Sequence, residues 1–329
     1  MADANVLRIG TRGSPLALTQ TRMVQSRLVA AHRRLAEPHA VEIVAIKTTG
    51  DRVQDVVLSV LGGKGLFTKE LDEALLDGRI DVAIHSMKDV PTFLPEGIVL
   101  SSLLVREDVR DAFVSPRYKS FAELPQGTIV GTASTRRRAQ ILARRPDLAV
   151  EPLRGNVETR IARLNEGSMA ATLLAYAGLR RLGKTEVARE VLPVETILPA
   201  VGQGALAATF RADDTRTRAL FQPLVDSATE AAIWAERAML AILDGSCQTP
   251  IAGYASLDGG KVLTLKGLIA HPNGTQVVEA QASGPAGEAD QIGVRVANEL
   301  LFKAGPALLR AIKSEQPHVY RVPSDPPTG

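Results

Sequence analysis

Two residues that could perform acid–base or electrostatic chemistry, Lys88 and Asp89, come directly after a predicted strand. Residues 80–84 alternate β-branched and other side chains, as strands do, and Val90-Pro91 ends regular structure after the pair. Ligands of open α/β sheets bind at the carboxyl ends of the strands, where this pair would lie. An ordinary surface ion pair explains the same residues, and this segment alone favours that interpretation.

Arginine is concentrated in one part of the chain, which favours an anion-binding site. Residues 131–181 contain ten arginines and four acidic residues, in a chain whose net charge is +3. Arg136, Arg137 and Arg138 follow a predicted N-cap, Ser134, and so begin a predicted helix. Cations at a helix N-terminus oppose the helix dipole, so we expect an anion there, which a nucleic acid or a small polyanion could supply.

A second arrangement of this kind follows the first strand. Residues 6–11 alternate like a strand, Arg12 follows, and Ser14-Pro15 begins a predicted helix. A strand, a polar loop and a helix N-terminus together form an anion site, to which Arg12 adds donors. For Ser14 alone, a plain helix cap is the preferred interpretation.

Two loops each carry one side chain of interest. Residues 62–65 hold Lys64 among glycines, which predicts a mobile loop that could act as a lid; the spacing is not that of a phosphate-binding Walker loop. Cys247, the only cysteine, lies in a polar loop. It is either a small apolar residue or, near a cationic site, a reactive thiolate.

The elements that position these residues alternate strand and helix up to residue 104 and again from residue 128, which is typical of parallel sheets. The charged residues 106–111 mark a boundary between the two parts. A helix over residues 226–243, with Trp234 expected in the core, precedes hairpin strands between residues 251 and 283. The predicted fold is therefore two α/β units followed by a smaller α+β unit.

Composition excludes several classes of protein. No apolar run approaches the ~20 residues of a membrane span, and the N-terminus lacks a basic and then apolar export signal. A single cysteine excludes an internal disulfide and makes a thiolate metal cluster unexpected. We expect a cytoplasmic protein without a metal site.

Five segments in order, residues 11–18, 62–67, 85–91, 153–156 and 245–250, resemble the porphobilinogen deaminase family, and the resemblance extends over about residues 6–313. It implies two similar α/β domains like those of periplasmic binding proteins and a smaller C-terminal α+β domain. The expected domains are residues 6–104 with 205–222, residues 110–198, and residues 227–313, followed by a disordered tail over residues 314–329.

The resemblance also implies the activity. Family members are transferases that join four porphobilinogen molecules head to tail into hydroxymethylbilane, releasing ammonia, in tetrapyrrole and haem biosynthesis. A dipyrromethane cofactor would be attached to Cys247 by a thioether and would prime the chain. The resemblance implies a monomer that binds neither nucleic acid nor membrane.

Roles for individual residues follow from the same resemblance. Asp89 would be the catalytic carboxylate, hydrogen-bonded to pyrrole N–H groups, and Lys64 would lie in the loop. The predicted cofactor-binding residues, besides Cys247 and Asp89, are Lys88, Ser134, Arg136, Arg137 and Arg154. The predicted substrate-binding residues are Arg12, Ser14, Phe67, Arg154, Arg160, Arg181 and Gln203.

The chain departs from the family pattern at Thr19, Val60, Ala170 and Ser246, which we expect to affect rates or chain-length control. Two other classes of protein could share some of these features. A solute receptor would be expected to carry an export signal and would not need Cys247. A nucleic-acid-binding protein would interleave stacking aromatics, whereas the arginine-rich region contains only Tyr176.

Overall fold

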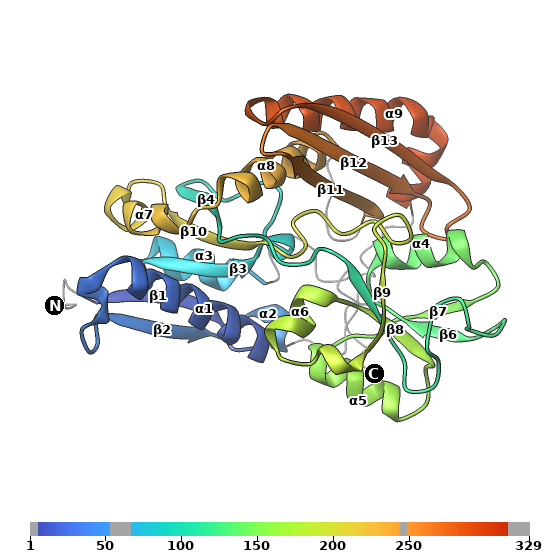
Figure 1. The fold of residues 1–329 in the computed structure, drawn as a ribbon, viewed down its shortest axis with the longest axis horizontal. Coiled ribbons are helices and arrows are strands. Elements are labelled where there is room, and N and C mark those ends of the chain that lie inside the picture. The colour runs from blue at the N-terminus through green and yellow to red at the C-terminus, as the bar shows by residue number, and fades with distance from the viewer. Residues whose placement is uncertain (1–5, 53–66, 244–248, 315–329) are drawn as a thin grey trace, which may run out of the picture.

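Three β-sheets organise the part of the chain that the computed structural model describes, residues 6–52, 67–243 and 249–314 (Figure 1). Two five-stranded sheets each belong to an α/β unit, and a three-stranded sheet belongs to a smaller C-terminal unit. In Figure 1 the first unit is mainly blue, the second is green, and the C-terminal unit is orange to red. The predicted fold class is confirmed, while the domain boundaries given above stay a prediction.

The first α/β unit contains a strand from much later in the chain. Its strands are β1 (Leu7–Arg12), β2 (Val41–Ile46), β3 (Val82–Ser86), β4 (Ile98–Leu103) and β10 (Leu206–Arg211), and its helices are α1 (Pro15–Ala31), α2 (Thr49–Arg52), α3 (Lys69–Leu76) and α7 (Thr215–Phe221). Short 3₁₀ turns are η1 (Arg33–Ala36), η2 (Met87–Asp89) and η4 (Gln222–Leu224). The strand order is β2-β1-β3-β10-β4, and β10 runs antiparallel to both neighbours. The strands β1, β2 and β3 run parallel, as the alternation of strand and helix predicted, and β10, which lies outside that alternation, runs against them.

The second α/β unit repeats this topology. Its strands are β5 (Asp111–Val114), β6 (Ile129–Gly131), β7 (Ala149–Glu151), β8 (Ala171–Ala175) and β9 (Ala188–Leu192). Its helices are α4 (Thr135–Arg144), α5 (Val157–Asn165) and α6 (Tyr176–Arg181), with a 3₁₀ turn η3 (Thr185–Val187). The order β7-β6-β8-β5-β9 places β5 where the first sheet has β10, again antiparallel to both neighbours.

The C-terminal unit packs two helices on an antiparallel sheet. The strands are β11 (Ile251–Asp258), β12 (Val262–Ala270) and β13 (Val277–Pro285), and the helices are α8 (Ser227–Ile242) and α9 (Ala289–Ser314), with a 3₁₀ turn η5 (Ala286–Glu288). Alternate residues of the strands, such as Leu263 and Leu265, are fully buried against α8 and α9. Trp234 of α8 is 36% exposed, so its expected place in the core is wrong.

Two stretches of chain connect the α/β units. The first crossing (residues 104–110) leads from β4 to β5, and the second crossing (residues 193–205) leads back from β9 to β10. The buried carboxylate of Glu236, on α8, binds both crossings: it accepts hydrogen bonds from Arg106 Nη1 at 2.6 Å and from the Gly202 N–H at 2.7 Å. The C-terminal unit is thereby anchored where the other two units join. None of the helices in the described ranges is long and apolar enough to cross a membrane.

Candidate functional site

Asp89 lies on the 3₁₀ turn η2, directly after β3, and the surrounding chain holds this turn in place. The Met87 N–H donates a hydrogen bond to the Ala205 carbonyl at 3.0 Å. Gly202 has a φ of +75° and packs so closely that a Cβ there would lie 2.7 Å from Met87 Cγ. Arg237 of α8 donates to the Pro91 carbonyl at 2.9 Å. The C-terminal unit and the second crossing therefore both help to position the carboxylate.

A pocket beside Asp89 brings several predicted residues of the first unit together. Arg12, Ser14, Phe67 and Asp89 all line it. The Arg12 guanidinium lies over the Phe67 ring, 4.2 Å from its centroid, which orients a cation beside an apolar surface. Ser14 caps α1, because its Oγ accepts a hydrogen bond from the Ala17 N–H at 3.3 Å.

Sequence reasoning missed four polar residues of this pocket, Gln20, Thr68, His85 and Ser86, of which Gln20 and Ser86 bind each other. Gln20 Nε2 donates to Ser86 Oγ at 3.0 Å, which joins α1 to the end of β3. Gln20 is 3% exposed and interrupts the buried stripe of α1. A polar residue on the apolar face of a helix was the signal that could have identified it.

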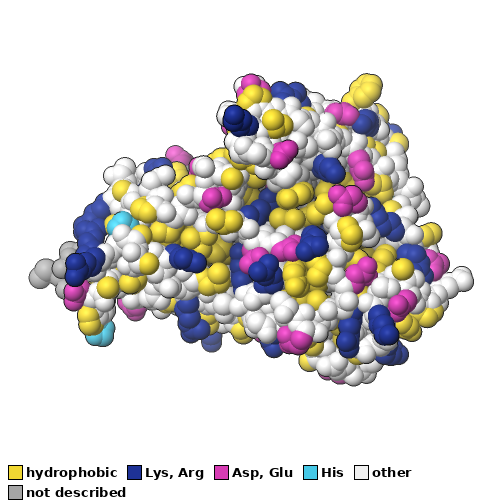
Figure 2. Space-filling model, in the orientation of Figure 1, with side chains coloured by type: hydrophobic (Ala, Val, Ile, Leu, Met, Phe, Trp, Pro, Cys, Tyr) yellow, Lys and Arg dark blue, Asp and Glu magenta, His cyan; other side chains and the backbone are white. Residues whose placement is uncertain are grey.

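Lys88 lies within electrostatic reach of Arg137, Asp111 and Arg136 of the second unit. Desolvation lowers the pKa of Lys88 to about 8, Asp89 opposes this effect, and Arg137 adds to it. The side chain keeps some accessible surface although protein atoms surround it, as expected for a residue in a deep cleft. In Figure 2, Lys and Arg side chains (dark blue) lie in the hollow between the C-terminal unit and the α/β units.

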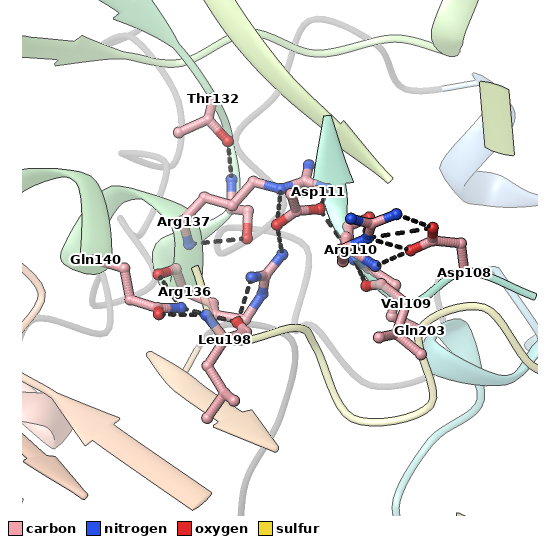
Figure 3. Close-up of polar contacts among 11 residues, drawn as sticks. Asp108, Val109, Arg110, Asp111, Thr132, Arg136, Arg137, Gln140, Leu198 and Gln203 are labelled. Carbon is pink, nitrogen blue, oxygen red and sulfur yellow. Dashed lines mark hydrogen bonds and ion pairs between the residues drawn. The ribbon is translucent and has the colours of Figure 1, made fainter. Parts of the chain in front are cut away.

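The two arginines at the start of α4 are buried and bind one carboxylate, that of Asp111 (Figure 3). Asp111 Oδ2 accepts from Arg136 Nη2 at 2.8 Å, and Oδ1 accepts from Arg137 Nη2 at 2.7 Å. Burial by itself would raise the pKa of Asp111, but the two guanidinium groups hold it well below its usual range. The anion expected at this helix N-terminus is thus supplied by the protein itself.

Ser134 caps α4 as predicted, with its Oγ accepting from the Arg137 N–H at 3.4 Å. Arg138, in contrast, is exposed. The charged residues 106–111 were interpreted as a boundary between the two units. That interpretation missed that Asp111 begins a buried strand.

The other predicted residues of the second unit and the second crossing face the same region. Desolvation lowers the pKa of Arg160 to about 10, with Arg137 adding to this effect, Asp89 opposing it, and Arg154 adding to it. Desolvation also lowers the pKa of Arg154. Arg181 donates to the Gly204 carbonyl at 2.6 Å, and Gln203 Nε2 donates to the Val109 carbonyl at 2.7 Å. Arg181 therefore joins the second unit to the second crossing, and Gln203 joins the two crossings to each other.

The described residues suit an anionic ligand such as a dipyrromethane, whose rings carry carboxylates. Arg136 Nε and Arg181 Nε are buried and have no hydrogen-bond partner among the described residues. In addition to desolvation, Asp89 raises and Arg137 lowers the pKa of both Lys88 and Arg160, so these four charged groups lie in one region. Buried cations in excess of the nearby acids need external anions. Cys247 and Lys64, the predicted attachment site and loop lysine, lie outside the described residues. Within the described ranges, no three His, Cys, Asp or Glu side chains group as metal ligands do.

Comparison with known proteins agrees with this chemistry. Residues 7–219 match the family model "Porphobilinogen deaminase, dipyromethane cofactor binding domain", and residues 231–302 match its C-terminal domain. A porphobilinogen deaminase of Paracoccus denitrificans is 52% identical over 91% of this chain and 95% of its own length. A chloroplastic porphobilinogen deaminase of Oryza sativa is 50% identical over 95% of this chain and 88% of its own.

A solved structure, the methionine-binding protein MetQ, is 16% identical, with a TM-score of 0.42 over 67% of this chain and 90% of that one. That overlap is too loose to support a conclusion. The sequence matches, in contrast, extend across both α/β units and the C-terminal unit. On this evidence the chain belongs to the porphobilinogen deaminase family of dipyrromethane-dependent transferases.

Proposed function

We propose that Asp89 is the catalytic carboxylate with which this enzyme joins four porphobilinogen molecules head to tail. The observation that carries this proposal is the position of Asp89. It lines the pocket with Arg12 and Phe67, and it lies within electrostatic reach of Lys88 and Arg160. One carboxylate among cations suits a reaction in which positive charge develops on a ligand whose periphery is anionic.

The charge of Asp89 serves each step of the polymerisation. When porphobilinogen loses ammonia, its ring becomes electron-poor, and a fixed carboxylate stabilises the positive charge that develops on the pyrrole nitrogen. The same oxygens accept hydrogen bonds from pyrrole N–H groups, which orients the ring. After the new carbon–carbon bond forms, the ring α-carbon that made the attack must lose its proton to restore the pyrrole, and we assign this transfer to Asp89, the carboxylate that lines the pocket.

The cations serve to bind rather than to react. We assign Lys88, Ser134, Arg136, Arg137 and Arg154 to the carboxylates of the cofactor, and Arg12, Ser14, Phe67, Arg154, Arg160, Arg181 and Gln203 to the substrate. When bound, the dipyrromethane supplies the free pyrrole carbon to which the first substrate adds. Guanidinium groups suit these contacts because they bind carboxylates through two parallel hydrogen bonds.

We further propose that the protein acts as a cytoplasmic monomer and binds neither nucleic acid nor membrane. Arg136 and Arg137 are buried, and Arg160 and Arg181 are desolvated, so this positive charge is directed inward. A nucleic-acid-binding surface would instead present its cations outward.

Intact mass spectrometry tests the attachment of the primer to Cys247. Purified wild-type protein should exceed its sequence mass by two linked pyrrole rings, and Cys247→Ala should show the sequence mass and no turnover. A matched control is Ser102→Ala, which removes a small polar group from a buried strand away from the pocket. An adduct on active Cys247→Ala protein would refute the proposal.

A further inference from the structure

Asp111 is an acidic side chain near the site and is not among the residues assigned to the cofactor or the substrate. It is fully buried at the start of β5. Its two oxygens accept four hydrogen bonds: Oδ2 from Arg136 Nη2 at 2.8 Å and Arg137 Nε at 3.2 Å, and Oδ1 from Arg137 Nη2 at 2.7 Å and Gln203 Nε2 at 3.0 Å. The carboxylate therefore fixes the direction of both guanidinium planes (Figure 3).

The fold itself does not require a charge at this place. In the second sheet Asp111 pairs with Ala175 and Leu192, the last residues of β8 and β9. In the first sheet the matching residue is Leu206, which pairs with Ser86 and Leu103, the last residues of β3 and β4. Leu206 is buried and apolar, so the same topology forms without a carboxylate there.

The bonds of Asp111 also leave part of the arginine pair available. Arg136 uses Nη2 for Asp111 and Nη1 for the Leu198 carbonyl at 2.7 Å. Its Nε, although buried, has no partner among the described residues. Burial lowers the pKa of Arg136, Asp111 opposes this effect, and Arg137 adds to it. The pair thus retains donor capacity and positive charge for a second anion.

We propose that Asp111 is a positioning residue, whose buried carboxylate orients Arg136 and Arg137 toward the carboxylates of the pyrrole chain. Its bond to Gln203 places this arginine pair in a defined relation to the second crossing, on which the Asp89 turn also packs. The inference rests on the proposed anion-binding role of the two arginines. Asp111 contacts no ligand in this scheme and acts only through them.

Asp111→Asn tests the inference, with Asp81→Asn as a matched control. Asp81 also bridges two arginines, Arg8 at 2.8 Å and Arg211 at 3.6 Å, but it lies just before β3, at the opposite edge of the first sheet. Both variants should lower the melting temperature. Assayed well below that temperature, Asp111→Asn should raise KM for porphobilinogen roughly tenfold or more and reduce the fraction of protein with the mass adduct. Asp81→Asn should change neither.

A double variant separates positioning from stability. If Asp111 acts through both arginines, Asp111→Asn/Arg137→Gln should have the KM of Asp111→Asn alone and a higher KM than Arg137→Gln. The double variant removes opposite charges together, so it keeps the test usable if Asp111→Asn does not fold. If folded Asp111→Asn has the wild-type KM and adduct fraction while Arg137→Gln is impaired, the positioning role of Asp111 is wrong. The proposed role of the arginines then still stands. Wild-type values in Arg137→Gln would overturn the proposed role of the arginines as well.

Discussion

The two α/β units can be compared residue by residue, because their sheets share one strand order and one register. Gly10 of β1 pairs with Ala83 where Gly131 of β6 pairs with Thr172, and a threonine follows each glycine. A Cβ at Gly10 would lie 2.3 Å from Ile80, and one at Gly131 would lie 2.3 Å from Met169. In both sheets a neighbouring side chain therefore packs closely against the glycine at the same point.

The units differ at the sheet edge that faces the cleft. The first unit places Arg12 at the end of β1, the apolar Leu206 at the start of its antiparallel strand, and Asp89 after β3. The second unit places arginines in the first turn of α4 and Asp111 at the start of its antiparallel strand. One scaffold thus presents a carboxylate toward the cleft, whereas the other presents cations with a counterion of their own.

We expect the largest effect from replacing Asp89, the carboxylate of the first unit. Asp89→Asn keeps the size of the side chain but removes its charge, and loss of one preorganised electrostatic group lowers kcat by roughly a hundredfold to a thousandfold. Single-turnover measurement of ammonia release from adduct-bearing protein checks this. Asp89→Glu, which keeps the charge but displaces it, should be faster than Asp89→Asn. Near-normal ammonia release by Asp89→Asn would contradict the proposal that the first unit supplies the catalytic carboxylate.

Substitution of a cation in the second unit should have a smaller effect and a different kinetic signature. Arg154→Leu removes charge-assisted hydrogen bonds worth roughly 1.5–3 kcal/mol, so we expect a higher KM or a lower adduct fraction rather than a lower kcat. Steady-state kinetics and intact mass measure these two quantities. Arg138→Leu is the control, because Arg138 is an exposed arginine of the same unit. Equal effects of the two substitutions would mean that ligand binding depends on the overall positive charge of the unit and not on the position of Arg154.

The pH dependence should separate the two units' cations. The pKa of Lys88 is lowered to about 8 and that of Arg160 to about 10, so raising the pH removes the charge of Lys88 first. At pH 9 roughly a tenth of Lys88 remains protonated, and kcat/KM should fall accordingly between pH 8 and 9. Lys88→Arg stays charged in this range and should lose that fall. If kcat/KM of Lys88→Arg decreases between pH 8 and 9 as the wild-type value does, the decrease is due to a group other than Lys88.

Local patterns predicted the parts of the site that are close in sequence. Ser14 and Ser134 are N-caps as expected, and Asp89 leaves the end of a strand toward a pocket that contains Arg12. The alternation of strands and helices also predicted the α/β class. Each of these inferences depends on the spacing of neighbouring residues, which the sequence displays directly.

What depends on distant pairing was not predictable in this way. Nothing near Asp111 indicates that Arg136 and Arg137 will bind it, because strand β5 is four residues long and follows a charged segment. The antiparallel direction of β10 likewise depends on where the second crossing returns. Trp234 was misplaced because an amphipathic pattern does not reveal how far a large side chain at the rim of a helix face is covered.

The return of the chain to the first unit bears on how the protein is made. β4 pairs only with β10 among the described strands, and β10 lies between β3 and β4 in the sheet. Residues 206–211 emerge from the ribosome after all five strands of the second unit have been synthesised. The second unit can therefore complete its sheet while the first still has an unfilled gap, so the unit to which we assign anion binding is available before the unit that carries the proposed catalytic carboxylate.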